Sequence, residues 1–156
     1  MAIPQYRMAT AAQFVGRELG ASEWVTVDQD RIDRFADCTG DRQWIHVDPE
    51  RAAAGPFGTT IAHGFLTLSL LPYFTARLRD TSAATMGINY GLDRVRFPTP
   101  VKVGSRVRAR ATIIDARPMG EGAVQFVTRV TIEIEDADKP ACIADLVTRY
   151  YFPAAD

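Results

Sequence analysis

The fold class depends on the segment Gly64-Phe65-Leu66-Thr67-Leu68-Ser69-Leu70-Leu71-Pro72-Tyr73-Phe74. Its apolar residues cover nearly every side of a helical projection, which predicts a helix enclosed by protein rather than one lying on a surface. Pro72 lacks a backbone donor and clashes with the preceding turn, so we expect a kink or an early end there. The segment therefore predicts the central helix of the fold.

Downstream of this segment the apolar period changes from 3.6 to 2, which is typical of half-buried strands. Val107, Ala109, Ala111 and Ile113, for example, alternate with polar residues. The pattern predicts strands over residues 22–27, 85–97, 106–113, 124–134 and 143–152, with a turn at 117–122. The sequence thus predicts a single α+β domain over residues 1–156, in which a curved antiparallel sheet wraps one long central helix.

Two shorter helices are expected before the central one. Residues 28–39 form an amphipathic pattern, with Asp28 as the N-cap and Gly40 as the stop. An Asp-Pro pair then opens a short helix over residues 48–54. Cys38 is expected on the apolar face of the first helix, where a cysteine behaves as an inert small hydrophobic residue.

The composition is that of an ordinary globular protein, with 47% hydrophobic and 24% charged residues among 156. Lys and Arg number 18 against 19 Asp and Glu, so we expect no nucleic-acid partner. Residues 1–7 do not resemble a secretion signal, and the longest apolar segment is too short to span a bilayer. We therefore expect a cytoplasmic protein with no membrane partner and no disulfide.

Several catalytic motifs are absent from the sequence. It contains no G-x-G-x-x-G, G-x-x-x-x-G-K-[ST], H-E-x-x-H or G-x-S-x-G pattern, which excludes nucleotide-driven and α/β-hydrolase chemistry as first interpretations. The two histidines and two cysteines lack ligand spacing, so no metal site is predicted.

Asp41 and His46 stand five residues apart, just beyond the expected stop at Gly40. A carboxylate beside an imidazole suits proton transfer near neutral pH. The same residues also suit a purely structural interpretation, in which Asp41 caps a turn and His46 is a core histidine with its hydrogen bonds satisfied. The spacing alone leaves both interpretations open.

Two motifs carry a resemblance to a known family. Thr39-Gly40-Asp41-Arg42-Gln43-Trp44-Ile45-His46 resembles the hydratase motif of MaoC-like dehydratases and (R)-specific enoyl-CoA hydratases, and Ile61-Ala62-His63-Gly64-Phe65-Leu66 resembles their following helix-entry segment. Many members have Asn-Pro where this chain has Gln43-Trp44, a departure that looks like the NodN-like branch. The resemblance covers most of the chain, from Gly20 to the final strand.

This resemblance implies a hot-dog fold, usually paired with a second copy, and hence a homodimer. It also implies that Asp41 and His46 activate a water that adds to C3 of a trans-2-enoyl-CoA to give (R)-3-hydroxyacyl-CoA. Coenzyme A is then part of the substrate, and no cofactor is expected. The backbone N–H of Gly64 is the candidate donor to the thioester oxygen, with close packing as the alternative role of this glycine.

Further site residues are expected around this pair. Gln43, Trp44 and Asn89 are candidates for lining the substrate pocket, while His63 is expected to serve backbone geometry. Arg94 and Arg96 begin a basic run and are candidates for binding the phosphates of coenzyme A, or else belong to a solvated strand face.

Other functions remain open on a hot-dog fold. Thioesterases and acyl-carrier dehydratases commonly place a catalytic acid on the central helix, and residues 64–79 contain no Asp or Glu. A non-catalytic acyl-CoA-binding protein, or a partner subunit of a heteromeric dehydratase, is the alternative from a different class.

Overall fold

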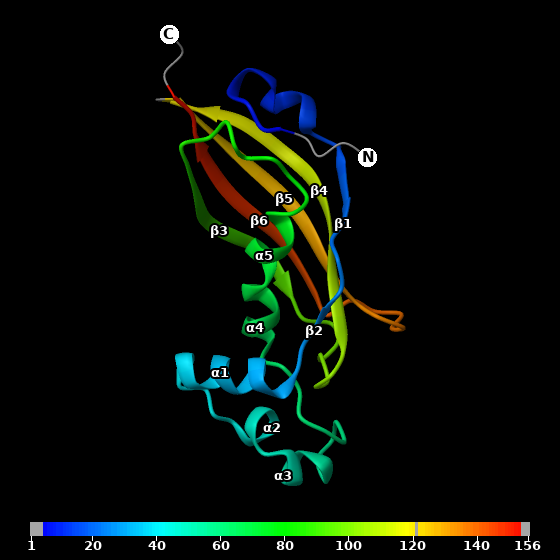
Figure 1. Ribbon diagram of the computed structural model, residues 1–156. Coiled ribbons are helices and arrows are strands. Elements are labelled where there is room, and N and C mark those ends of the chain that lie inside the picture. Colours follow the sequence, from blue (N-terminus) through cyan, green and yellow to red (C-terminus); the bar gives the residue numbers. More distant parts are fainter. Residues whose placement is uncertain (1–4, 121, 154–156) are drawn as a thin grey trace.

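The alternating apolar residues of the C-terminal half form a curved antiparallel sheet in the computed structural model, which describes residues 5–120 and 122–153 (Figure 1). Within these residues the sheet has six strands in the order β1-β4-β5-β6-β3, with β2 also paired to β4. Val107, Ala109, Ala111 and Ile113 are all buried, as the period of two predicts. The strands are β1 (Glu18–Ala21), β2 (Val25–Thr26), β3 (Met86–Arg96), β4 (Arg106–Met119), β5 (Ala123–Ile134) and β6 (Cys142–Tyr151).

The four predicted strands after the helices are present, whereas the strand predicted over residues 22–27 is reduced to β2 (Val25–Thr26) and β1 (Glu18–Ala21) was not predicted. A further difference lies at the hairpin between β4 and β5. The strand β4 continues to Met119 and pairs Met119 with Ala123, so the connection is shorter than the turn predicted over residues 117–122. Glu121, within that turn, lies outside the described residues.

The apolar segment forms two short helices, α4 (Gly64–Ser69) and α5 (Leu71–Thr75), on one face of the sheet (Figure 1). The prediction of one long helix is therefore wrong, whereas the interruption at Pro72 is confirmed. Pro72 stands in the first turn of α5, where its missing N–H costs nothing. Leu70 joins the two helices in a right-handed helical conformation.

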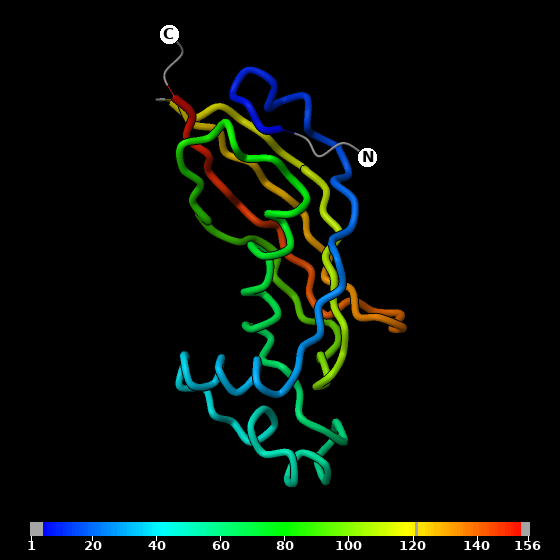
Figure 2. The backbone as a smooth tube through the Cα atoms, viewed as in Figure 1, coloured from blue at the N-terminus to red at the C-terminus, as the bar shows by residue number. Residues whose placement is uncertain are grey.

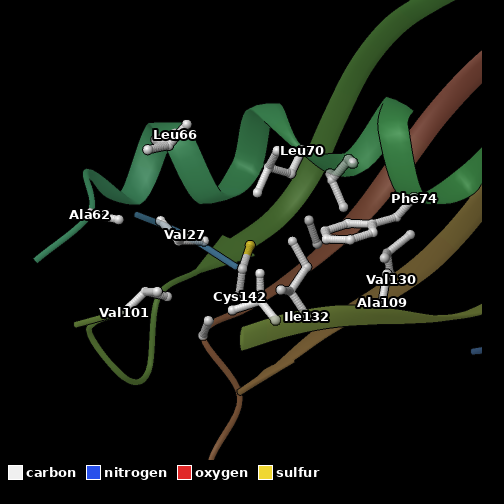
Figure 3. Close-up of a cluster of buried hydrophobic side chains, with 14 of the residues drawn as sticks. Val27, Ala62, Leu66, Leu70, Phe74, Val101, Ala109, Val130, Ile132 and Cys142 are labelled. Atoms are coloured by element: carbon white, nitrogen blue, oxygen red, sulfur yellow. The ribbon is translucent and has the colours of Figure 1, made fainter. Parts of the chain in front are cut away.

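The main core lies between these helices and the sheet. Figure 3 shows Leu70 and Phe74 directed toward the strands that carry Val130 and Ile132, and these four side chains and Leu66 are all buried. The prediction that the helix is enclosed on every side is wrong, because Phe65 is 68% exposed and Tyr73 is 41% exposed.

Three helices lie at one end of the α4–α5 column: α1 (Gln29–Thr39), α2 (Trp44–Val47) and α3 (Pro49–Ala53). The helix η1 (Met8–Phe14) lies at the opposite end near the last strand (Figures 1 and 2). Asp28 caps α1 by accepting from the Arg31 N–H, and Gly40 ends it with φ 77°, as predicted. The expectation for Cys38 is wrong: it is exposed, because the buried face of α1 is formed by Ile32 and Ala36.

The strand β3 forms one edge of the sheet, since it pairs only with β6 in the strand order. Large apolar residues along it are exposed: Met86, Ile88, Tyr90 and Leu92. Within the described part of the chain, no helix combines the length and apolar character needed to cross a membrane.

Candidate active site

Local geometry after α1 brings the predicted acid and histidine together. Gly40 takes a left-handed conformation that turns the chain out of α1, and an Asp41 carboxylate oxygen then accepts from the Gln43 N–H at 3.4 Å. The short helix α2 follows and places His46 near its end, where we had expected an irregular loop. One ligating atom from each of Asp41, His46 and His63 lies within 4.8 Å of the other two.

The hydrogen bond at the His46 ring determines which nitrogen is available for chemistry. Nδ1 of His46 lies 2.7 Å from the carbonyl oxygen of Ile61. Because a carbonyl only accepts, Nδ1 carries the proton, and Nε2 of the neutral ring is left as a hydrogen-bond acceptor and base. Such a tautomer is suited to taking a proton from water.

The surroundings favour the neutral form of this ring. Burial is the main cause that lowers the pKa of His46 below its usual value of 6.5, and His63 lowers it further. The Ile61 carbonyl and the Asp41 carboxylate act in the opposite direction. His46 is only 6% exposed, whereas Asp41 is exposed. At neutral pH the site therefore combines an uncharged base with a solvated acid.

A cavity of about 300 Å³ lies beside His46. His46 and Gly64, the first residue of α4, both line it. The Phe97 ring packs against Gly64: a Cβ at this position would lie 3.1 Å from the ring. The lining is mostly apolar and consists of His46, Phe57, Ile61, Ala62, Gly64, Thr67, Phe97, Thr99, Pro100, Val101 and Ala141.

The cluster of Asp41, His46 and His63 has the composition of a metal site, but its rings are badly placed for one. The two imidazoles are stacked, with centroids 3.7 Å apart and planes inclined by 24°. A metal ion bonds in the plane of an imidazole at about 2.1 Å from nitrogen, and these two planes do not meet within that distance. The arrangement suits proton transfer better than a shared ion.

Gln29, which the sequence did not single out, holds the backbone of the site. Its amide nitrogen donates to the His46 carbonyl at 2.8 Å, and its amide oxygen accepts from the Thr60 hydroxyl at 2.6 Å. Both contacts join residues far apart in sequence. From the sequence, only the position of Gln29 at the start of an expected helix could be predicted.

The residues expected to line the substrate pocket lie in several places. Gln43 is exposed in the turn before α2, and the Trp44 ring packs against Gly55, where a Cβ would lie 2.9 Å from it. The Arg51 guanidinium covers the Trp44 ring at 4.5 Å from its centroid. Asn89 lines a separate cavity of about 210 Å³ between α4, α5 and β3. None of Gln43, Trp44 and Asn89 is part of the lining given above for the cavity at His46.

Three arginines of the basic run are paired with acids on or just after the neighbouring strand β5. Arg106 pairs with Glu135, and Arg108 pairs with Glu133 at 2.7 Å. Arg110 also pairs with Glu133. These guanidinium groups thus belong to ion pairs across the sheet.

Arg94 and Arg96 lie at the β3 edge and are both exposed. Arg94 lies 3.9 Å from the Asp145 carboxylate, which Arg129 holds with two shorter hydrogen bonds. Arg96 donates to the carbonyl of Val95. Among the described residues, no hydrogen bond or ion pair joins Arg94 or Arg96 to Asp41 or His46.

The chain is similar in sequence to known proteins. The sequence model of the MaoC like domain matches residues 10–135. The chain is 52% identical over 143 residues to 3-hydroxyacyl-thioester dehydratase Z of Mycobacterium tuberculosis, covering 92% of this chain and 95% of that protein. It is 50% identical over 151 residues to Nodulation protein N of Rhizobium leguminosarum bv. viciae, covering 96% and 94%.

The fold is also found among solved structures. The chain resembles the (R)-hydratase from A. caviae involved in PHA biosynthesis with a TM-score of 0.67 and 23% identity, covering 89% of this chain and 96% of that one. This likeness places the curved sheet and its helical column in the hot-dog fold.

Proposed function

Since the chain belongs to the MaoC-like dehydratase family, we propose that it catalyses the reversible hydration of a trans-2-enoyl-CoA to an (R)-3-hydroxyacyl-CoA. One observation carries the proposal: a buried, neutral His46 with Nε2 available lies beside the Asp41 carboxylate and opens on an apolar cavity. A neutral base, a carboxylate and an apolar cavity suit a reaction that adds water to an uncharged acyl chain.

In the proposed reaction, Asp41 and Nε2 of His46 hold one water. The water oxygen forms a bond to C3 as Nε2 takes a proton from it. The electrons of the C2–C3 double bond move toward the thioester oxygen, and C2 then receives a proton from His46, Asp41 or the same water. The net change is the addition of one H₂O, so no oxidant or cofactor is needed.

The developing charge on the thioester oxygen needs a positioned donor. We assign this role to the N–H of Gly64, because the first amide of a helix has no partner within that helix. Gly64 also lines the same cavity as His46. The absence of a side chain allows the thioester to approach closely, although the Phe97 ring limits the space on one side.

The remaining expected contacts are retained as part of the proposal. Arg94 and Arg96 are exposed guanidinium groups suited to the phosphates of coenzyme A. Gln43 lies directly after the catalytic turn, and Asn89 lines the apolar cavity beside α4 and α5, where part of an acyl chain fits. Trp44 acts through its packing against Gly55.

We further propose that two copies pair as a homodimer through β3. An edge strand exposes unpaired backbone groups, and here it also exposes Ile88, Tyr90 and Leu92. The exposed rings of Phe65 and Tyr73 extend the apolar surface onto the helical column. Light scattering after gel filtration is expected to give twice the chain mass, and Ile88→Asp is expected to shift the protein toward monomer. A monomeric wild type would contradict this assembly.

The central experiment follows the loss of the conjugated absorbance of crotonyl-CoA for the wild type, Asp41→Asn and His46→Gln. A stereospecific 3-hydroxyacyl-CoA dehydrogenase then assigns the handedness of the product. We expect the (R) product and a loss of several orders of magnitude in both variants. A folded wild type that leaves crotonyl-CoA and longer enoyl-CoAs unchanged would refute the proposal and favour a binding protein or a partner subunit.

A further inference from the structure

His63 makes one contact with each member of the Asp41–His46 pair. We propose that His63 is a positioning residue that holds the Asp41 backbone and the face of the His46 ring, so that carboxylate and imidazole meet the same water. This inference rests on the proposed hydratase function and deepens it.

The first contact is a hydrogen bond from His63 to the backbone of Asp41. Nε2 of His63 lies 2.9 Å from the Asp41 carbonyl oxygen. Because the carbonyl only accepts, Nε2 carries the proton in this bond. The bond joins the residue before α4 to the turn after α1, across 22 positions of sequence. It therefore adds a long-range tie to an exposed turn whose other contacts are local: two hydrogen bonds of 3.4 Å that involve Asp41, a 3.1 Å bond from the Arg42 N–H to the Gly40 carbonyl and an ion pair between Arg42 and Asp37.

The second contact is the stack on His46. The ring centroids lie 3.7 Å apart, and Phe35 packs against His63 with its centroid at 5.0 Å. His63 is only 2% exposed, so its ring has little freedom to leave this position. The stack sets the plane of the His46 ring, while the Ile61 carbonyl sets its rotation within that plane.

Residues 61–63 therefore contact both Asp41 and His46. The Ile61 carbonyl binds Nδ1 of His46, and the His63 ring contacts both His46 and Asp41. A hydrocarbon ring at position 63 would fill the same space and keep a stack, but it would lose the bond to Asp41.

Nδ1 of His63 supports a fixed ring state. This atom is buried and has no hydrogen-bond partner in the structure. The bond from Nε2 to the Asp41 carbonyl identifies the Nε2–H tautomer, in which Nδ1 is left as an acceptor.

The test compares His63→Phe, which keeps a ring but removes the donor, with His63→Gln, whose amide nitrogen reaches the place of Nε2. With crotonyl-CoA we expect His63→Phe to lower kcat roughly 100-fold with little change in KM, because misplacement of a catalytic group by about 1 Å costs that much. His63→Gln is expected to recover most of the lost kcat. Thr75→Val, which removes a buried hydroxyl on α5 that bonds only to the Leu71 carbonyl, controls for loss of stability alone.

Equal kcat for His63→Phe, His63→Gln and the wild type would overturn the inference. So would equally low kcat in both variants, because the donor would then not be the cause.

A measurement independent of activity separates this inference from the proposed function. The chain has two histidines, so its imidazole ¹H–¹⁵N spectrum contains two ring systems, which His46→Gln and His63→Gln assign. We expect His46 as the Nδ1–H tautomer and His63 as the Nε2–H tautomer. His63→Phe should shift the backbone ¹⁵N resonance of Arg42, whose peptide group contains the Asp41 carbonyl.

Each pattern of results has one meaning. The expected tautomers and the Arg42 shift in a protein inactive on enoyl-CoAs would refute the hydratase proposal while leaving the contact of His63 with Asp41 established. An unchanged Arg42 resonance in His63→Phe would overturn the role of His63, whatever the activity of the wild type.

Discussion

Replacement of Gln29 by alanine is expected to destabilise the protein, because its side chain satisfies two groups of the site from a distance. The amide accepts from Thr60, which is 1% exposed, and donates to the carbonyl of His46. A third bond, from the same amide nitrogen to Asp33, lies at the surface and contributes little. Only the bonds of Gln29 with Thr60 and with His46 are counted in the expected loss of unfolding free energy.

The magnitude follows from those two bonds. A buried polar group left without its partner costs about 1–3 kcal/mol, so Gln29→Ala is expected to lose about 3 kcal/mol of unfolding free energy. For a domain of this size, about 1 kcal/mol shifts Tm by about 2–4 °C, which gives a decrease of about 10 °C. Thr60→Val removes a buried hydroxyl together with its need for a partner, so its loss is expected to be smaller, about 1 kcal/mol.

Thermal and urea unfolding followed by circular dichroism measure both variants against the wild type. Gln29→Glu is the sharper comparison, since a carboxylate still accepts from Thr60 but cannot donate to His46. We expect Gln29→Glu to be at least as damaging as Gln29→Ala. A loss below about 0.5 kcal/mol in Gln29→Ala, the range of ordinary surface substitutions, would refute the reasoning.

Four further outcomes are expected. The kcat/KM of the wild type should fall on acidification with a midpoint below pH 6.5, because burial lowers the pKa of His46 and the neutral ring is the proposed base. A midpoint above pH 6.5 would contradict the assignment of His46 as the base. Because the pKa of His46 is lower in the folded protein, the unfolded chain binds a proton at this histidine more readily than the folded protein does. The free energy of unfolding should therefore decrease at this group as pH falls below 6.5, which urea titrations at several pH values measure. Gly64→Ala keeps the backbone N–H but adds a Cβ 3.1 Å from the Phe97 ring, so it should lower kcat/KM about 10-fold by crowding the thioester. Steady-state kinetics measure this loss, and wild-type kinetics would argue against close approach of the thioester to residue 64. Phe126→Ala should cost about 3–5 kcal/mol in urea unfolding, because this fully buried ring stacks on Tyr6 with centroids 4.3 Å apart. A loss below about 1 kcal/mol would contradict close packing around this ring.

Local features of the fold could be predicted from the sequence because they depend on neighbouring residues. The cap at Asp28, the stop at Gly40 and the interruption at Pro72 each follow from the chemistry of one residue and its adjacent turn. The strands followed from their alternation. The apolar pattern of the central helix did not reveal that Phe65 and Tyr73 are exposed, because hydrophobicity does not distinguish burial in one chain from a surface available to a second chain.

The site was only partly predictable for a related reason. Proximity of Asp41 and His46 followed from a short separation and a glycine between helices. The contacts of Gln29 with His46 and of His63 with Asp41 span 17 and 22 positions, and no local pattern encodes them. The acids that pair with the basic run were invisible for the same reason, since Glu133 and Glu135 belong to a different strand.

The segment that holds the catalytic pair is also tied to the wall of the cavity. The Ala62 N–H donates to the Val101 carbonyl at 2.7 Å, and the Val103 N–H donates to the Thr60 carbonyl at 3.0 Å. Val101 lines the cavity beside His46. Substitutions that reshape this wall are therefore expected to displace the His46 ring as well. Under the proposed hydration, the selectivity for the acyl chain and the rate of the reaction would depend on the same two backbone hydrogen bonds.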